Sequence, residues 1–456
     1  MQNFRKSTFL GLCLIFLMTT VSFTSQVRSF LTLPTQQRIP VGEQVRLDLD
    51  FPNEIMEKLS LDVRTETDGV LKIDGSEMIS EKVLGFSQTW PVAIQPGKVK
   101  LNLKLFGIIP LRQMTVNVVA QNKVYPGGQS IGVMLQAQGV SIVGYSPVKG
   151  HDDRNHFPAK EAGVEIGDQI ISINGVQVAT DKEAARVIDK AGDSKLPVEM
   201  ILKRNDRKIE VSIAPEYCKE TERYRIGLFI RDSAAGVGTL TFFEPNSKTY
   251  GALGHVIIDA ETNKQIDLGH GKVVSAAVHG IQQGKKGQPG EKIGIFQEKG
   301  IRGNIEKNTT VGIFGEMSKI PENPYFDSPL PVALVNQIQP GSATVYTVVD
   351  GNKIERFSIE IERVMPYNRI EGKGMVIRIN DPKLLSITGG IIQGMSGSPI
   401  VQNGKLVGAV THVFINDPTR GYAVPAEWML NETESITKTR TISKIDPGFL
   451  HISRNS

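Results

Sequence analysis

The stretch at residues 389–400, Gly-Gly-Ile-Ile-Gln-Gly-Met-Ser-Gly-Ser-Pro-Ile, constrains the fold of this chain more than any other stretch. Gly394 and Gly397 stand on either side of Ser396. Since glycine lacks a Cβ atom, the backbone can turn sharply at both positions and can approach another segment closely. Asn403-Gly404, a strong signal for a tight hairpin turn, follows between two apolar runs. The pattern predicts a serine on a tight loop that leads directly into a β-hairpin.

Such a loop is typical of the nucleophile in two-barrel serine proteases. The amides of Gly394 and Ser396 are predicted to form the oxyanion hole for a tetrahedral intermediate. The hairpin argues against an α/β-hydrolase, in which the nucleophilic serine leads into a helix. The alternative is a plain turn between strands, because Gly, Ser and Pro dominate turns of every kind.

The whole chain is predicted to be mainly β. Its 456 residues are enough for about three domains, and Val- and Ile-rich runs separated by glycine turns dominate its central and C-terminal parts. The formal net charge is +4, without a block of like charges, so we expect no nucleic acid among its partners. The sequence has no His-Glu-x-x-His, Cys-x-x-Cys or phosphate-binding motif. We therefore expect neither a metal nor another cofactor.

The N-terminus predicts export. Arg5 and Lys6 precede an apolar run at residues 9–23, which is the order found in signal sequences. We expect residues 1–25 to be a signal-anchor, with a cleaved signal peptide as the alternative. Leu12 precedes Cys13 where a lipoprotein has a small residue, so a lipid anchor is not expected. Because Cys13 lies in the leader and only Cys218 follows it, the exported part has no internal disulfide.

Residues 26–121 are predicted to form a separate β-rich module. Apolar and polar residues alternate at residues 43–50, 59–64 and 98–105, which places one face of each strand on a core and the other in water. Turn signals separate these runs, so a small sandwich-like module is expected. A spacer or docking role is the default for it.

Residues 122–215 resemble a PDZ domain. The resemblance rests on an apolar-Gly-apolar stretch at Ile131, Gly132 and Val133, and on the run at residues 162–176 with its Gly-Asp and Ile-Asn-Gly turns. The amides of the first stretch are predicted to bind a peptide C-terminal carboxylate, and the following strand to pair with the peptide. A predicted helix at residues 182–191 lines the other side of the groove. The alternative is a structural insert whose groove stays empty.

Residues 216–456 are predicted to be the peptidase domain. His255 follows Gly254 and lies upstream of the serine, the order found in two-barrel proteases. The sequence leaves other candidates open for both the base and the acid. They are His270, His279 and His412 for the base, and Asp259, Asp267, Asp350 and Asp381 for the acid.

The apolar leader, the PDZ-like module, Leu253-Gly254-His255 and the motif at residues 389–399 occur together in this order. With the tail at residues 421–430, the chain resembles the stage IV sporulation protein B peptidases of endospore-forming bacteria. That resemblance implies a catalytic triad of His255, Asp381 and Ser396. The fold expected for the whole chain is then a signal-anchor, the small sandwich-like module at residues 26–121, a PDZ domain and a C-terminal two-barrel, trypsin-like peptidase domain.

The resemblance further implies a sporulation serine endopeptidase that crosses the forespore membrane and is anchored there or released into the intermembrane space. It would cleave itself in trans and cut a membrane-tethered regulator between forespore and mother cell. That cut would free an intramembrane metalloprotease, which activates a late sigma factor. The alternative is a non-catalytic, membrane-anchored PDZ scaffold. A periplasmic quality-control protease fits less well, since its PDZ domain usually follows the protease.

Overall fold

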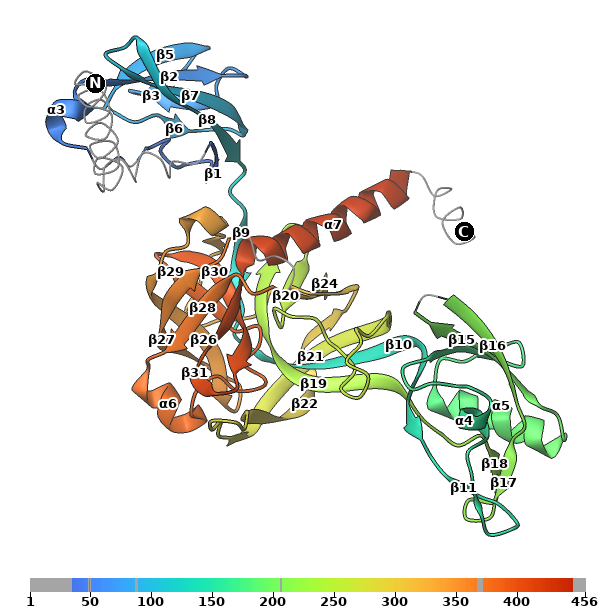
Figure 1. Ribbon diagram of the computed structural model, residues 1–456. Helices are drawn as coiled ribbons and strands as arrows, with labels where there is room; N and C mark the ends of the chain where they lie inside the picture. The colour runs from blue at the N-terminus through green and yellow to red at the C-terminus, as the bar shows by residue number, and fades with distance from the viewer. Residues whose placement is uncertain are drawn as a thin grey trace, which may run out of the picture. The chain divides into compact units, whose positions relative to one another are not determined.

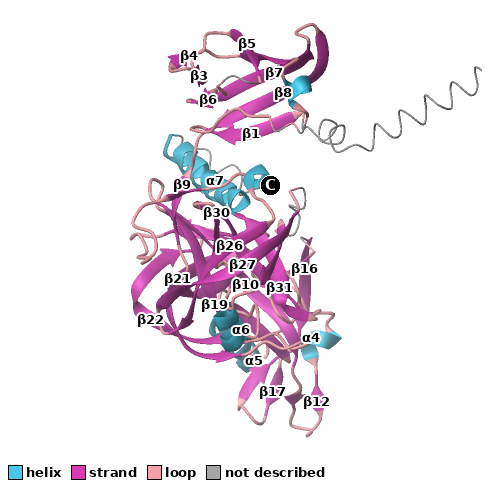
Figure 2. Ribbon diagram, turned by 90° about the vertical axis from the view of Figure 1, so that its left-hand side faces the viewer, coloured by secondary structure: helices cyan, strands magenta, loops and turns pink. Residues whose placement is uncertain are grey.

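The computed structural model describes residues 35–47, 49, 51–86, 89–205, 207–366 and 372–445. The predicted signal-anchor at residues 1–25 lies outside them. Within this part of the chain, no helix has both the length and the apolar character needed to cross a membrane. The chain divides into two compact units, Met1–Asn122 and Lys123–Ser456. Strands dominate both units, as Figure 2 shows.

The first unit consists of two sheets, ordered β1-β8-β7-β2-β5 and β4-β3-β6, that share one hydrophobic core. In β7, Val99, Leu101 and Leu103 are buried, whereas Lys98 and Lys100 are exposed, so the alternation in sequence places one strand face on the core. The elements are β1 (Gln36–Pro40), α3 (Asn53–Met56), β2 (Leu59–Thr65), β3 (Leu71–Ile73), β4 (Ser76–Glu77), β5 (Glu81–Gly85), β6 (Val92–Ala93), β7 (Gly97–Leu105) and β8 (Ile109–Val119).

The second unit contains a 13-stranded sheet and a closed six-stranded barrel, ordered β26-β27-β28-β31-β30-β29. The sequence predicted two barrels in the peptidase domain. The closed barrel corresponds to the second of them, whereas the strands that precede it belong to the long sheet. The barrel elements are β26 (Gly341–Asp350), β27 (Lys353–Val364), β28 (Met375–Ile379), α6 (Pro382–Thr388), β29 (Pro399–Gln402), β30 (Lys405–Phe414) and β31 (Asp417–Pro425), followed by α7 (Ala426–Ile445).

The long sheet begins before the PDZ-like module and resumes after it. Its strands outside that module are β9 (Lys123–Pro126), β10 (Ser130–Tyr145), β19 (Leu228–Glu244), β20 (Thr249–Ala252), β21 (Leu268–Gln282), β22 (Glu291–Asn304), β23 (Lys307–Thr309), β24 (Gly312–Glu316) and β25 (Leu330–Pro331). A short helix, η1 (Val335–Gln337), precedes the barrel. Two of these strands, β10 and β19, run on into the PDZ-like module, as Figure 1 shows.

The PDZ-like module has its own hydrophobic core. Its Gly-Asp turn is fixed by Asp168, whose buried carboxylate accepts two hydrogen bonds from the Arg204 guanidinium, at 2.7 and 2.6 Å. The elements are β11 (Val148–Lys149), β12 (Asn155–His156), α4 (Pro158–Glu161), β13 (Gln169–Ile173), β14 (Val176–Gln177), α5 (Asp181–Asp193), β15 (Val198–Arg204), β16 (Arg207–Ile213), β17 (Glu216–Cys218) and β18 (Arg223–Arg225).

The structure draws the domain boundaries differently from the sequence. We expected a PDZ domain at residues 122–215 that precedes a peptidase domain at residues 216–456. Instead, the first half of β10 pairs with β19 on one edge and with β21 on the other, in the middle of the long sheet. The PDZ-like module is therefore inserted into that sheet between β10 and β19.

Candidate active site

The serine loop connects α6 to β29 and requires glycine at two positions. Gly394 has a φ of 88° and Gly397 a φ of 92°, in the left-handed region that favours glycine. A Cβ atom on Gly397 would lie 2.0 Å from the carbonyl oxygen of Thr239. The loop therefore lies directly against β19, which explains the glycine after the serine.

Two threonines of β19 hold this loop in place. The Thr239 hydroxyl donates to the Gly394 carbonyl at 2.7 Å, and the Thr239 amide donates to the Ser396 carbonyl at 2.9 Å. The Thr241 hydroxyl donates to the Gly397 carbonyl at 2.8 Å. These bonds fix the backbone on both sides of the serine.

Two amides of the loop are left free. In the stretches that the structure describes, neither the amide of Gly394 nor that of Ser396 has a hydrogen-bond acceptor. Unpaired amides beside a serine hydroxyl can bind an oxyanion. Their role as an oxyanion hole stays a prediction.

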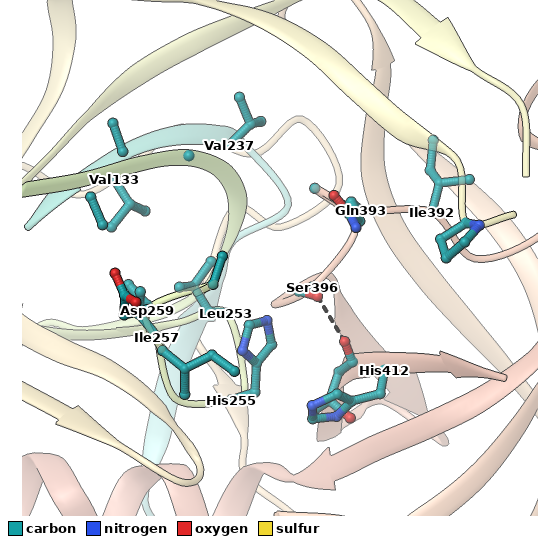
Figure 3. Close-up of a pocket in the computed structure, with 18 of the residues that line it drawn as sticks. Val133, Val237, Leu253, His255, Ile257, Asp259, Ile392, Gln393, Ser396 and His412 are labelled. Carbon is teal, nitrogen blue, oxygen red and sulfur yellow. Dashed lines mark hydrogen bonds between the residues drawn. The ribbon is translucent and has the colours of Figure 1, made fainter. Parts of the chain in front are cut away.

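Ser396 and His255 line the same cleft, which has a volume of about 670 Å³. Its walls come from β19, the loop after β20, the serine loop and β30. Figure 3 shows His255, Ser396 and His412 together in this cleft. The structure thus brings together the predicted nucleophile and the predicted base.

A strained turn presents His255. Leu253 has a φ of 67°, which is rare for a residue with a branched side chain, and Gly254 has a φ of 72°. A Cβ atom on Gly254 would lie 2.9 Å from the Thr411 methyl carbon, so this turn packs against the barrel. Backbone strain of this kind is often found where a functional side chain must be placed.

The hydrogen bonding of His255 defines its tautomer. Nδ1 lies 2.8 Å from the Val256 carbonyl oxygen, which can only accept, so Nδ1 carries the proton. Nε2 is then unprotonated and can act as a base. Desolvation lowers the pKa of His255 below its ordinary value, against a smaller opposite effect of the Val256 carbonyl. The imidazole is therefore neutral at pH 7.

The Ser396 hydroxyl does not point its proton at His255 in this conformation. It donates to the Thr411 carbonyl at 2.7 Å, as Figure 3 shows. Transfer of that proton to His255 requires the hydroxyl to turn away from the Thr411 carbonyl. The structure therefore shows a resting arrangement of the pair.

Comparison with known families assigns this part of the chain. The family described as SpoIVB peptidase S55 matches residues 222–430, and the PDZ domain family matches residues 156–201. The SpoIVB peptidase S55 match thus covers the C-terminal part of the chain, a little under half of its length. It is a serine peptidase with a PDZ domain.

Solved structures give more distant likenesses. The active form of the Rv3671c protease from M. tuberculosis is 14% identical with a TM-score of 0.28, and the match covers 43% of this chain and 72% of that one. Deg5 is 15% identical with a TM-score of 0.27, and the match covers 43% of this chain and 81% of that one. No curated protein matches the sequence.

The structure does not place Asp381 in the role that the resemblance implied. Asp381 is the N-cap of α6: its Oδ1 accepts the Leu384 amide and its Oδ2 accepts the Ser358 amide, both at 3.1 Å. An aspartate followed by Pro382 is a typical helix start, and each carboxylate oxygen accepts one main-chain amide. The prediction of Asp381 as the carboxylate bound to the histidine is wrong in this conformation.

Of the other acidic candidates, Asp259 and Asp267 are engaged elsewhere, and Asp350 is an exposed residue of β26 that is missing from the described residues lining the cleft. Asp259 does line the cleft, but its Oδ1 accepts the amide and hydroxyl of Thr262, and its Oδ2 accepts a hydrogen bond from Arg231. Asp267 pairs with Lys203 at 2.9 Å. The group that orients His255 is therefore the Val256 carbonyl, a main-chain atom that residue types cannot reveal.

Among the rival histidines, only His412 reaches this cleft. Its ring centroid lies 5.2 Å from that of His255, and its side chain is exposed. His270 and His279 lie on β21 and are missing from the described residues that line the cleft.

A buried lysine beneath the serine loop was missed by sequence reasoning. The ammonium group of Lys292 donates to the Thr347 hydroxyl at 2.8 Å, and the Ser398 hydroxyl donates to the same oxygen at 2.9 Å. The Lys292 amide donates to the Gln393 carbonyl at 3.0 Å. Desolvation lowers the pKa of Lys292 to about 7. In sequence, nothing distinguishes it from a solvent-exposed lysine at the start of a strand.

The predicted peptide-binding loop at Ile131, Gly132 and Val133 is wrong. These residues lie inside β10 and pair with β19 on one edge and β21 on the other, so the segment has no free edge for a peptide.

The groove of the PDZ domain lies instead between α5 and residues 223–230, with a volume of about 310 Å³. There Ile226-Gly227-Leu228 repeats the same apolar-Gly-apolar pattern, and Gly227 has a φ of 79°. The apolar-Gly-apolar pattern at residues 226–228, rather than the one at residues 131–133, is therefore the sequence feature that marks the groove.

Proposed function

We propose that this chain is a sporulation serine endopeptidase in which Ser396 is the nucleophile and His255 the general base. The observation that carries the proposal is that both side chains line one cleft, beside the unpaired amides of Gly394 and Ser396 in the described part of the chain. The match of residues 222–430 to the SpoIVB peptidase S55 family supports the sporulation context.

The chemistry follows from the positions of the donors and acceptors. Ser396 attacks the scissile carbonyl carbon while its proton passes to Nε2 of His255, and that proton then goes to the leaving amine. The Val256 carbonyl keeps Nδ1 protonated and the ring oriented throughout. The amides of Gly394 and Ser396 bind the oxyanion, and one such donor typically lowers the barrier by about 3 kcal/mol.

The family and the N-terminal sequence together support a site of action outside the forespore membrane. In this proposal residues 1–25 direct export and hold the enzyme at the membrane until it is released. Its partners are a membrane-tethered regulator of an intramembrane metalloprotease, which it cuts, and a second copy of itself, which it cleaves in trans. Cutting the regulator activates a late sigma factor.

One observation favours the alternative, a membrane-anchored PDZ scaffold without catalysis. The Ser396 hydroxyl donates to a main-chain carbonyl, and within the described residues no carboxylate is hydrogen-bonded to His255. A scaffold would keep this conformation permanently.

Self-fragmentation tests the proposal. The chain without residues 1–25 is purified as wild type, as Ser396→Ala and as Ser386→Ala, a matched change at an exposed serine of α6. The wild type and Ser386→Ala are expected to shorten over hours, and Ser396→Ala to stay intact with an unchanged fold by circular dichroism. Fragmentation of Ser396→Ala at the wild-type rate would assign the cutting to a contaminant. Intact chains in all three preparations, together with no cleavage of an added denatured protein, would support the scaffold.

A further inference from the structure

One strand, β19, contributes to the peptide groove, the catalytic cleft and the serine loop. Its first residues, Leu228–Ile230 in sequence, line the groove of the PDZ domain. Residues 233–237 line the catalytic cleft. Thr239 and Thr241 then bind the serine loop. The two sites therefore lie along a single continuous backbone.

This strand has a free edge between the two sites. From Leu228 to Val237 it pairs with β10 on one side, and β20 joins its other side only from Leu240 onward. In the described parts of the chain, no other strand pairs with this stretch. Ser233 and Ala235 are exposed on it.

The backbone groups of this edge point into the cleft. At Thr239 the amide donates to the Ser396 carbonyl and the carbonyl accepts the Leu253 amide, so both groups face away from β10. Alternate residues of a strand point the same way, and the register with β10 is unbroken from Thr239 to Ser233. Val237, Ala235 and Ser233 therefore offer their amides and carbonyls to a peptide in the cleft.

The charges at the groove give a bound peptide its direction. Arg223 and Arg225 line one end of the groove. This end lies beside the last part of α5, because the Tyr224 amide donates a hydrogen bond to the Asp189 carboxylate. Asp181, the first residue of α5, lines the other end, where its amide donates to Asp232. A carboxylate is attracted to the arginine end and repelled from the aspartate end.

We propose that a single substrate strand occupies both sites, with its C-terminal carboxylate at Arg223 and Arg225 and its scissile bond at Ser396. The inference rests on the proposed peptidase activity. From the carboxylate the peptide runs antiparallel to β19, past Ser233 and Ala235, to Val237. Leu228 and Val237 are nine positions apart, a span of about 30 Å at the rise of a β-strand. The enzyme thus measures its cut from the end of the substrate, about ten residues before the C-terminus.

Peptide libraries test the spacing directly. Randomised 24-residue peptides with a free C-terminal carboxylate are incubated with the enzyme, and the cut positions are mapped by mass spectrometry. Cuts are expected to cluster about ten residues from the C-terminus. Amidation of the C-terminus is expected to lower kcat/KM at least tenfold and to abolish the clustering. Cuts at every distance from the end, unchanged by amidation, would overturn the inference.

Variants of the groove residues provide a second test of the inference. Arg223→Glu with Arg225→Glu is expected to act like amidation, whereas Arg186→Glu, at an exposed position of α5 outside the groove, leaves the cut pattern unchanged. A separate decapeptide with a free carboxylate, protected from cleavage by N-methylation, is expected to inhibit cleavage competitively. Activation by that decapeptide would contradict a single shared strand and indicate a remote switch.

Denatured casein separates failure of the inference from failure of the proposed function. If wild type cuts casein, Ser396→Ala does not, and the cuts in the library are not clustered, the proposed peptidase activity is supported and the inference is overturned. If neither casein nor the library is cut, the proposed activity fails, and the inference fails with it.

Discussion

At Ser396 and His255, both catalytic protons are held by main-chain carbonyls. The Ser396 hydroxyl donates a hydrogen bond to the Thr411 carbonyl, and Nδ1–H of His255 donates one to the Val256 carbonyl. A carbonyl orients the imidazole as a carboxylate does, but it carries no full charge to stabilise the imidazolium that forms during catalysis. This arrangement therefore favours the neutral imidazole in the resting enzyme.

The pH dependence of activity tests that description of His255. Because desolvation lowers its pKa, the protonated form that cannot accept the serine proton is populated only below the ordinary range of a histidine. We expect kcat/KM to rise with pH with a midpoint below 6.5, the ordinary value for a histidine. The variant His255→Ala is expected to lose at least 10³-fold in kcat, and His270→Ala to retain wild-type activity. A midpoint above pH 7 would contradict this environment for the ring.

Lys292 makes the stability of the enzyme depend on pH in a direction opposite to that of a salt-bridged lysine. Its pKa is about 7 in the folded protein and about 10.5 when exposed, so between these values the unfolded state binds more protons. The free energy of unfolding is then expected to increase with pH across that interval, by at most ~1.4 kcal/mol per pH unit. Below pH 7 the full cost of burying the charge is present.

Urea unfolding of wild type and Lys292→Met between pH 7 and pH 9 measures this effect. The variant keeps the volume of the side chain and is expected to lose the slope, and to be more stable than wild type near pH 7. Parallel curves for the two proteins would show that Lys292 stays charged in the fold.

At the level of single elements, the serine loop was predictable and its surroundings were not. Gly394, Ser396 and Gly397 carry local turn chemistry, which can be read from adjacent residues. The pattern at residues 131–133 and that at residues 226–228 are locally alike, and only long-range pairing with β19 and β21 decides that the first is a buried strand. Asp381 shows the converse, since its local preference as a helix cap prevailed over the family expectation.

Gly397 tests how closely the loop must approach β19. A Cβ atom there would lie 2.0 Å from the Thr239 carbonyl and 2.5 Å from the Leu253 amide nitrogen, both backbone atoms. Gly397→Ala is expected to cost at least about 3 kcal/mol in stability, from the positive φ plus the clash, and to abolish activity.

Gly404→Ala is the matched control. Gly404 has a φ of 73° but open space around its Cβ position, so only the backbone cost of about 1–2 kcal/mol applies and activity is retained. Thermal unfolding and peptide hydrolysis of the two variants measure the difference. Equal effects would show that the loop has room to move away from β19.

Considered as a whole, the second unit joins binding and catalysis through shared backbone and a few side-chain contacts. Besides β10 and β19, Lys203 of the PDZ domain pairs with Asp267, and the Lys264 ammonium donates to the Gly167 carbonyl at 3.2 Å. Sequence predicted both components, because each has local motifs. It did not predict the insertion, because strands nearly 100 positions apart become neighbours only through tertiary pairing.

The insertion also dictates the order in which the molecule can assemble. The PDZ domain is complete once the chain has been made through residue 231, so it can fold before the strands that follow it have been made. The catalytic cleft needs β10, β19 and residues up to His412, and its loop is fixed only when Thr239 meets Gly394, 155 positions later. Closing such distant contacts is slow. During synthesis, a nascent chain therefore gains a complete ligand-binding domain long before it has a working nucleophile.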